Sequence, residues 1–229
     1  MHLMSDLLFS TPFFGLALSV VCWCLGVRLQ KKTGLLVCNP VLVSSLLVIA
    51  VLLLFRIPLE HYNAGGSIIK LMLGPATAVL ALNIYQQRKV LRQHFLPVLF
   101  GCLAGSLASI VCVLLFCHLF RVDEIFTASM LPKSVTTAIA LGISENGGGI
   151  PGLTAAAVII TGVEGAMLAP LFAKWFHISD PVAEGVAIGS CSHAIGTSKA
   201  MEIGSLQGAM SSIAICVCGI ITSILALFF

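Results

Sequence analysis

The chain has 229 residues, of which 59% are hydrophobic and 9% are charged, and its net charge is +3. Soluble domains carry roughly 25% charged residues, so the composition excludes a sizeable soluble domain, and the small net charge does not indicate nucleic-acid binding. Apolar runs of about 20 residues, the length that crosses a bilayer as a helix, recur along the chain. We therefore predict an all-α polytopic membrane protein in which residues 1–229 form a single membrane domain.

About six apolar runs are long enough to form full transmembrane helices. They cover residues 7–27, 35–55, 67–85, 95–120, 153–176 and 206–229. The pair Asn39-Pro40 is expected to kink the second helix or delay its start, because a residue before proline disfavours helical geometry. Gly74 and Pro75 predict a break in the third helix, since proline lacks a backbone N–H and clashes with the preceding turn.

The basic residues of the first half, residues 1–128, predict the topology. Residues 28–32 and 88–92 are basic and are expected to be cytoplasmic under the positive-inside rule. The mixed-charge segments 56–66 and 121–127 are then loops on the outside. The N-terminus lacks the positive charges that begin a signal peptide, so we predict an uncleaved first helix with its N-terminus outside.

The second half, residues 129–229, contains two short, interrupted segments. The first, residues 129–144, is followed by Gly147, Gly148, Gly149 and Pro151, which disfavour a continuous helix. The second, residues 185–200, is polar and glycine-rich, and follows a predicted loop at 180–184 whose Pro181 suits the first turn of a helix. Paired interrupted segments are a sequence signal for a transporter site. We predict two broken or re-entrant helices, with an inverted repeat as a further hypothesis.

The first interrupted segment opens with Lys133, Ser134, Thr136 and Thr137. If a helix begins near Lys133, its free N–H groups and positive dipole end, together with the ammonium and the hydroxyls, would form a site for a small anion. The alternative is a lysine at the membrane surface beside a hydroxyl-rich helix cap. The residue types alone leave both open.

The second segment carries a similar polar cluster. Its members are Ser192, His193, Gly196, Thr197 and Lys199. His193 and Thr197 are neighbours at i, i+4 if the segment is helical, whereas a break at Gly196 would free backbone amides for a carboxylate. Lys199 and Glu202 are spaced to form an ion pair. His193 has a structural alternative, but the polar density around it favours a binding role, and its titration range would suit proton coupling.

Glu164 lies within the apolar run 153–176. A carboxylate inside a membrane span is by default a functional candidate, here for ion coupling, and the alternative is a protonated or lysine-paired structural residue.

The sequence predicts neither a metal site nor an enzyme. Most of the nine cysteines lie inside apolar runs, without a C-x-x-C motif or clustered histidines, so we interpret them as packing residues. The chain contains no G-x-S-x-G or H-E-x-x-H motif, and Ser192 beside His193 is only sequence adjacency. We expect no cofactor.

Several motifs resemble the LrgB/CidB family. They are Leu-Pro-Lys-Ser-Val-Thr-Thr at 131–137, Gly-Gly-Ile-Pro at 148–151, Ser-His-Ala-Ile-Gly-Thr at 192–197, Gly-Pro-Ala-Thr at 74–77, and the segments 208–212 and 218–223. The chain departs from the family pattern at Asn83 and Ala138, where proline is expected, at Lys199, where arginine is common, and at Glu164, where an apolar residue is expected.

The resemblance implies two functions. The family was described as holin- or antiholin-like, controlling murein hydrolase export and lysis with a small LrgA/CidA-type membrane partner, and it also includes a plastid glycolate/glycerate transporter and bacterial pyruvate carriers. Our hypothesis is a secondary carrier of small monocarboxylates such as pyruvate, glycolate or glycerate. The alternatives are a holin-like regulator and a plain scaffold subunit. We expect a homo-oligomer, specifically a dimer, in the bacterial inner membrane.

Overall fold

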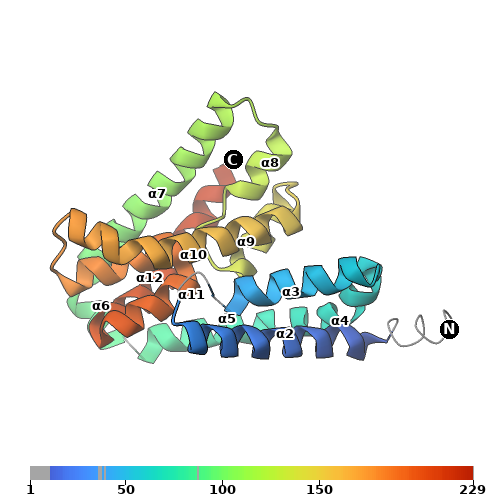
Figure 1. Cartoon of the computed structure of the whole chain (residues 1–229). Helices are drawn as coiled ribbons and strands as arrows, with labels where there is room; N and C mark the ends of the chain where they lie inside the picture. The colour runs from blue at the N-terminus through green and yellow to red at the C-terminus, as the bar shows by residue number, and fades with distance from the viewer. Residues whose placement is uncertain (1–10, 36–37, 39, 87, 229) are drawn as a thin grey trace, which may run out of the picture. The chain divides into compact units, whose positions relative to one another are not determined.

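The computed structural model describes residues 11–35, 38, 40–86 and 88–228, and these contain helices and no strands (Figure 1). Four helical segments are long and apolar enough to cross a membrane: Pro12–Thr33, Phe95–Leu119, Pro151–Trp175 and Ser205–Phe228. Pro40–Leu54 is apolar but shorter. These helices confirm the prediction of an all-α membrane protein. The described residues contain four helices long enough to span a membrane, fewer than the six that were predicted.

The chain divides into two compact units, Met1–Ala78 and Val79–Phe229. The helices of the first unit are α2 (Pro12–Thr33), α3 (Pro40–Leu54), α4 (Leu59–Leu71) and the start of α5 (Leu73–Gln86). Because α3 begins at Pro40, the expected delay of the second helix is confirmed; Asn39 lies outside the described residues.

The predicted outside loop 56–66 is wrong for most of its length, because α4 begins at Leu59. Glu60 in the first turn and Lys70 in the last turn complement the helix dipole, so this less apolar segment still forms a helix. The chain leaves helical hydrogen bonding at Met72, just before Gly74 and Pro75, which lie in the first turn of α5. Proline is tolerated there because its missing N–H would have no partner inside the helix.

Two glycines allow α2 and α4 to approach closely. Gly15 and Gly65 are both buried, and a Cβ atom on Gly65 would meet the backbone of Pro12 and Leu16. Ser19 and Tyr62 add a hydrogen bond between their hydroxyl groups at 2.9 Å. Small residues of this kind are the usual means by which membrane helices bring their backbones together.

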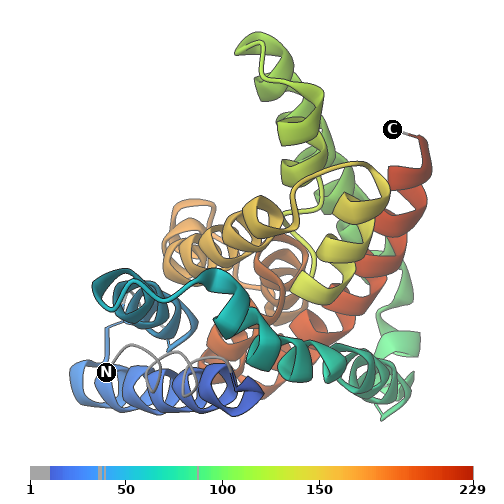
Figure 2. The ribbon, with the colours of Figure 1, turned by 90° about the vertical axis from the view of Figure 1, so that its right-hand side faces the viewer.

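The second unit is built on a helical hairpin. Its helices are α6 (Arg88–Gln93), α7 (Phe95–Leu119), α8 (Glu124–Met130), α9 (Thr137–Asn146), α10 (Pro151–Trp175), α11 (Pro181–Ile203), α12 (Ser205–Leu225) and the 3-10 turn η2 (Ala226–Phe228). Only Gly204 separates α11 from α12, so these two helices pack against each other. Figure 2 shows α12 crossing in front of α7.

The main apolar core of this unit lies where α7, α11 and α12 meet. Its buried members are Val98, Cys102, Val182, Val186, Met210, Ile213, Ala214 and Cys218. Two cysteines of the sequence therefore occupy packing positions in the core, where a small side chain suits a close helix crossing.

Three segments of this unit differ from the sequence prediction. The predicted outside loop 121–127 is helical from Glu124, where α8 begins. The predicted loop 180–184 is already helical from Pro181, because Asp180 caps α11 by accepting hydrogen bonds from the backbone N–H groups of Val182 and Ala183 at 2.7 and 3.1 Å. The segment 129–144 is divided between the end of α8, a turn and most of α9. An N-cap residue such as Asp180 stabilises the start of a helix, and hydropathy alone does not reveal where that start lies.

We predict that Gly65→Ala destabilises the protein while Gly66→Ala does not. The added methyl group at position 65 would collide with the α2 backbone, at a cost of about 1–3 kcal/mol for overpacking. At position 66 the only neighbour among the described residues is a Tyr62 ring carbon at 3.9 Å. Thermal unfolding of the detergent-purified variants measures the difference. Equal melting temperatures would contradict the close α2–α4 contact.

Candidate functional site

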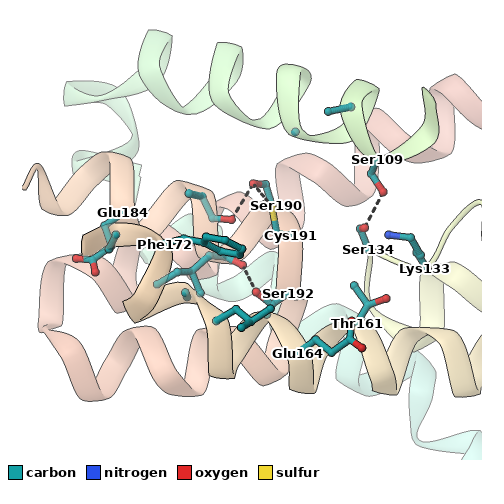
Figure 3. Close-up of a pocket in the computed structure, with 18 of the residues that line it drawn as sticks. Ser109, Lys133, Ser134, Thr161, Glu164, Phe172, Glu184, Ser190, Cys191 and Ser192 are labelled. Atoms are coloured by element: carbon teal, nitrogen blue, oxygen red, sulfur yellow. Dashed lines mark hydrogen bonds between the residues drawn. The ribbon is translucent and has the colours of Figure 1, made fainter. Parts of the chain in front are cut away.

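A pocket of about 450 Å³ lies in the second unit (Figure 3). It is lined by residues of α7, α10 and α11, by Lys133 and Ser134 from the turn between α8 and α9, and by Ile178 from the connection between α10 and α11. Most of its lining is apolar. The pocket brings together four of the predicted site residues, namely Lys133, Ser134, Glu164 and Ser192.

The turn at residues 131–136 presents Lys133 and Ser134 to the pocket because α9 begins only at Thr137. Ser134 shares a hydrogen bond with Ser109 of α7, with 2.7 Å between the hydroxyl oxygens. Figure 3 shows this hydrogen bond and the Lys133 side chain at one end of the pocket. The contact with α7 holds the turn in place, so the ammonium group of Lys133 is presented from an ordered position.

Thr136 and Thr137 are not among the residues that line this pocket. Thr136 is the N-cap residue of α9, but its side chain makes no capping hydrogen bond. Its Oγ1 is buried and has no hydrogen-bond partner among the described residues. The helix therefore begins at Thr137 rather than near Lys133, and Lys133 belongs to the turn before it.

Helix α11 is interrupted at His193, whose backbone has φ 40° and ψ −140°. The sequence also allows a break at Gly196, but the non-helical residue is His193. The His193 Nε2–H donates to the carbonyl oxygen of Val158 in α10 at 2.8 Å, and the side chain is buried. His193 does not line the pocket, so the structure gives its imidazole a packing contact between two helices.

The hydroxyl groups that flank His193 are also engaged within the protein. Ser192 donates to the Ile188 carbonyl at 2.9 Å, and Thr197 donates to the His193 carbonyl at 3.0 Å. Thr197 also shares a hydrogen bond with Ser211 of α12 at 2.7 Å. Because buried hydroxyls need such partners, these hydroxyl groups bond within α11 and to α12 rather than being left free for a ligand.

Gly196 and Lys199 lie away from the pocket. A Cβ atom on Gly196 would meet the Ser192 side chain and, at 3.1 Å, Ile188, so this glycine serves close packing within α11. Lys199 pairs with Glu202 at 2.8 Å, as its spacing predicted. An exposed ion pair of this kind contributes little to stability. The carboxylate of Glu202 nevertheless compensates the positive charge of Lys199.

The glycines Gly147, Gly148 and Gly149 form the connection between α9 and α10, and Pro151 is the first residue of α10. Gly148 has φ +74°, a conformation that favours glycine. The Ile150 N–H donates to the Ser129 hydroxyl at 2.7 Å, and Thr154 donates to Ser144 at 2.6 Å. This connection is thus fixed by buried hydroxyl groups.

Several pocket residues were not selected from the sequence. They are Ser109, Thr161, Phe172, Glu184, Ser190 and Cys191, among others. Thr161 precedes Glu164 by one helical turn, and this i, i+3 spacing indicates that both side chains lie on the same face of the helix. Ser109 and Phe172 gave no signal, because a serine in a small-residue run and a phenylalanine in an apolar helix are common packing residues. In the described part of the chain, no three His, Cys, Asp or Glu side chains gather as metal ligands.

The comparisons with known proteins agree with the sequence motifs. The model of the LrgB-like family matches residues 19–229. The chain is 39% identical over 206 residues to the uncharacterized protein YxaC of Bacillus subtilis (strain 168), with 90% of each chain covered. It is 38% and 37% identical over 213 residues to antiholin-like proteins LrgB of Bacillus mycoides (strain KBAB4) and Bacillus cereus (strain B4264), with 93% of each chain covered. No solved structure matches the chain.

The apolar helices and these bacterial relatives together identify a multi-pass membrane protein of a bacterial family.

We predict that His193→Gly unfolds at a higher temperature than His193→Ala. Both variants lose the hydrogen bond to Val158, but only glycine adopts a φ of 40° without steric cost. The backbone strain is of order 1–3 kcal/mol, which exceeds the entropy cost of a glycine, about 0.5–1 kcal/mol. Thermal unfolding in detergent compares the two variants. If alanine were as stable as glycine, the interruption of α11 at this residue would be wrong.

Proposed function

Because the chain belongs to the LrgB-like family, we propose that it acts as an antiholin-like membrane protein. The observation that carries this proposal is the similarity, over 93% of the chain, to proteins named antiholin-like protein LrgB. Its action would be to regulate murein hydrolase export and lysis through an LrgA/CidA-type small membrane partner. We keep the bacterial inner membrane, an N-terminus outside and a homodimer as predictions.

The internal hydrogen bonds of the signature segments support this proposal. Ser192, His193 and Thr197 bond to helix carbonyls and to a neighbouring hydroxyl, so much of the polar motif is used in helix packing. A regulator that contacts another membrane protein needs a defined helical surface more than it needs free ligand-binding groups. The packing of α11 on α12 through Gly189, which approaches Ser211 and Ala214, would maintain that surface.

We predict that this protein lowers the release of a large dye from vesicles containing the LrgA/CidA-type partner. If it binds the partner, fewer partner molecules are free to assemble into lesions. Fluorescence of a released, quenched dye measures the effect at increasing ratios of the two proteins. Release that is unchanged at every ratio would contradict the antiholin role.

A matched pair of glycine variants tests whether the α11–α12 packing is required. Gly189→Ala places a methyl group against Ala214 Cβ at 2.8 Å, whereas a Cβ at Gly142 of α9 has nothing within 4 Å. The first variant is expected to lose the inhibition and the second to keep it.

The second candidate function is a secondary carrier of small monocarboxylates such as pyruvate, glycolate or glycerate. The observation that favours it is the presentation of Lys133, with Ser134 beside it, to a pocket of about 450 Å³. Lys133 would attract the carboxylate and the hydroxyl group would orient it. Glu164, which lines the same pocket, is better placed than the buried His193 to exchange a proton with a substrate.

For the carrier function we predict that Lys133→Ala reduces counterflow of labelled pyruvate or glycolate about tenfold or more, because a charge-assisted contact is lost. Lys199→Ala is the control, since Lys199 is paired with Glu202 outside the pocket. Flux is measured in liposomes containing the purified protein. Leak-level flux in the wild type, or the same flux in wild type and Lys133→Ala, would contradict a carrier.

A further inference from the structure

The pocket contains two opposite charges that are paired neither with each other nor with any other group among the described residues. Lys133 and Glu164 both line it, and neither makes an ion pair or a side-chain hydrogen bond within the described part of the chain. Figure 3 shows Lys133 and Ser134 toward the same side of the view as Thr161 and Glu164. Lys133 is half-buried and Glu164 is exposed, and both unmatched groups line the cavity.

The third charged group of the pocket is already engaged. Glu184 accepts a hydrogen bond from the Gln207 side chain at 3.1 Å. It lies in the first turn of α11, where the helix dipole stabilises a negative charge. Lys133 and Glu164 are thus the charges for which the described structure supplies no compensation.

Unmatched charges in an apolar helical domain are costly, and charge interactions are strong in surroundings of low dielectric constant. A ligand with one negative and one positive group would compensate both. A simple carboxylate would compensate Lys133 but would bring a second negative charge into the pocket that contains Glu164. The charges therefore favour a dipolar ligand over an anion.

The rest of the pocket is suited to an apolar ligand body. Leu168, Phe172 and Ile178 contribute apolar side chains to its lining. A volume of about 450 Å³ lies within the usual range for small-molecule pockets, roughly 300–1,000 Å³. A ligand with a charged head and a short apolar body would match both parts of the lining.

We propose that this pocket binds a small zwitterion, with adjacent ammonium and carboxylate groups on an apolar body, as in an aliphatic α-amino acid. Lys133 and the Ser134 hydroxyl contact the carboxylate, and Glu164 contacts the ammonium group. The inference rests on the second candidate function, in which the pocket binds a small solute, and it assigns that solute a different chemical class from a monocarboxylate.

Three probes of nearly the same shape test the charge requirement. They are L-leucine, 4-methylpentanoate, which lacks the ammonium group, and 3-methylbutylamine, which lacks the carboxylate. Equilibrium binding is measured at pH 7 on the wild-type protein in phosphatidylglycerol nanodiscs, whose headgroups carry no ammonium and so do not compete. Leucine is expected to bind about tenfold or more tightly than either analogue, because each analogue leaves one protein charge uncompensated.

Two variants test the assignment of each charge. Glu164→Gln is expected to raise the affinity for 4-methylpentanoate relative to leucine about tenfold, and Lys133→Gln to do the same for 3-methylbutylamine. Lys199→Gln is the control, because Lys199 lies outside the pocket and is paired with Glu202. The comparison of the three probes on the wild-type protein needs no variant, so a folding defect in a variant leaves the test intact.

The outcomes separate this inference from the carrier function. If 4-methylpentanoate binds the wild type as tightly as leucine, the zwitterion is wrong, and pyruvate counterflow can still support a monocarboxylate carrier. If none of the three probes binds, the zwitterion is also wrong. Leucine preference together with the absence of any pyruvate counterflow supports the zwitterion and contradicts the monocarboxylate.

Discussion

The second unit depends on the close approach of α11 to its neighbours at small residues. Gly165 of α10 and Gly196 of α11 both leave space for Ser192, while Gly185 and Gly189 lie against α12 at Gln207, Met210, Ser211 and Ala214. The hydrophobic effect contributes little to the association of membrane helices, because lipid tails are as apolar as the helix surfaces. Dispersion contacts and interhelical hydrogen bonds therefore provide much of the association energy. A larger side chain at these positions would push apart the helices that the other contacts join.

This close packing explains how the polar motif around His193 is accommodated. At a short helix separation, the His193 imidazole reaches the Val158 carbonyl, and the Thr197 hydroxyl reaches Ser211. Among the described residues that line the pocket, the charged groups without a hydrogen bond or ion pair are Lys133 on the turn before α9 and Glu164 on α10. Lys133 and Glu164 line the pocket, whereas His193 and Thr197 of the α11 motif do not.

The helix termini and short-range ion pairs of the fold could be predicted from the sequence. Which polar residues lie together in space could be predicted only in part. Pro151 at the start of α10 and the Lys199–Glu202 pair follow from short-range rules about helix termini and i, i+3 spacing. The sequence left open a continuous helix or a break at Gly196, the residue with the greater backbone freedom, whereas the interruption lies at His193, which tertiary contacts hold in a strained conformation. Ser109 could not be selected, because its role depends on a hydroxyl 25 positions further along the chain.

By itself, the sequence determined that this is an all-helical membrane protein of a particular family, because hydropathy, charge spacing and contiguous motifs are properties of the chain alone. Only the tertiary structure decided which polar residues meet. Two clusters of similar composition have different surroundings: Lys133 and Ser134 reach a pocket, while His193 and Thr197 are enclosed by α10 and α12. The physical reason is that a hydroxyl or imidazole bonds to the nearest available partner, and helix packing sets which partner that is.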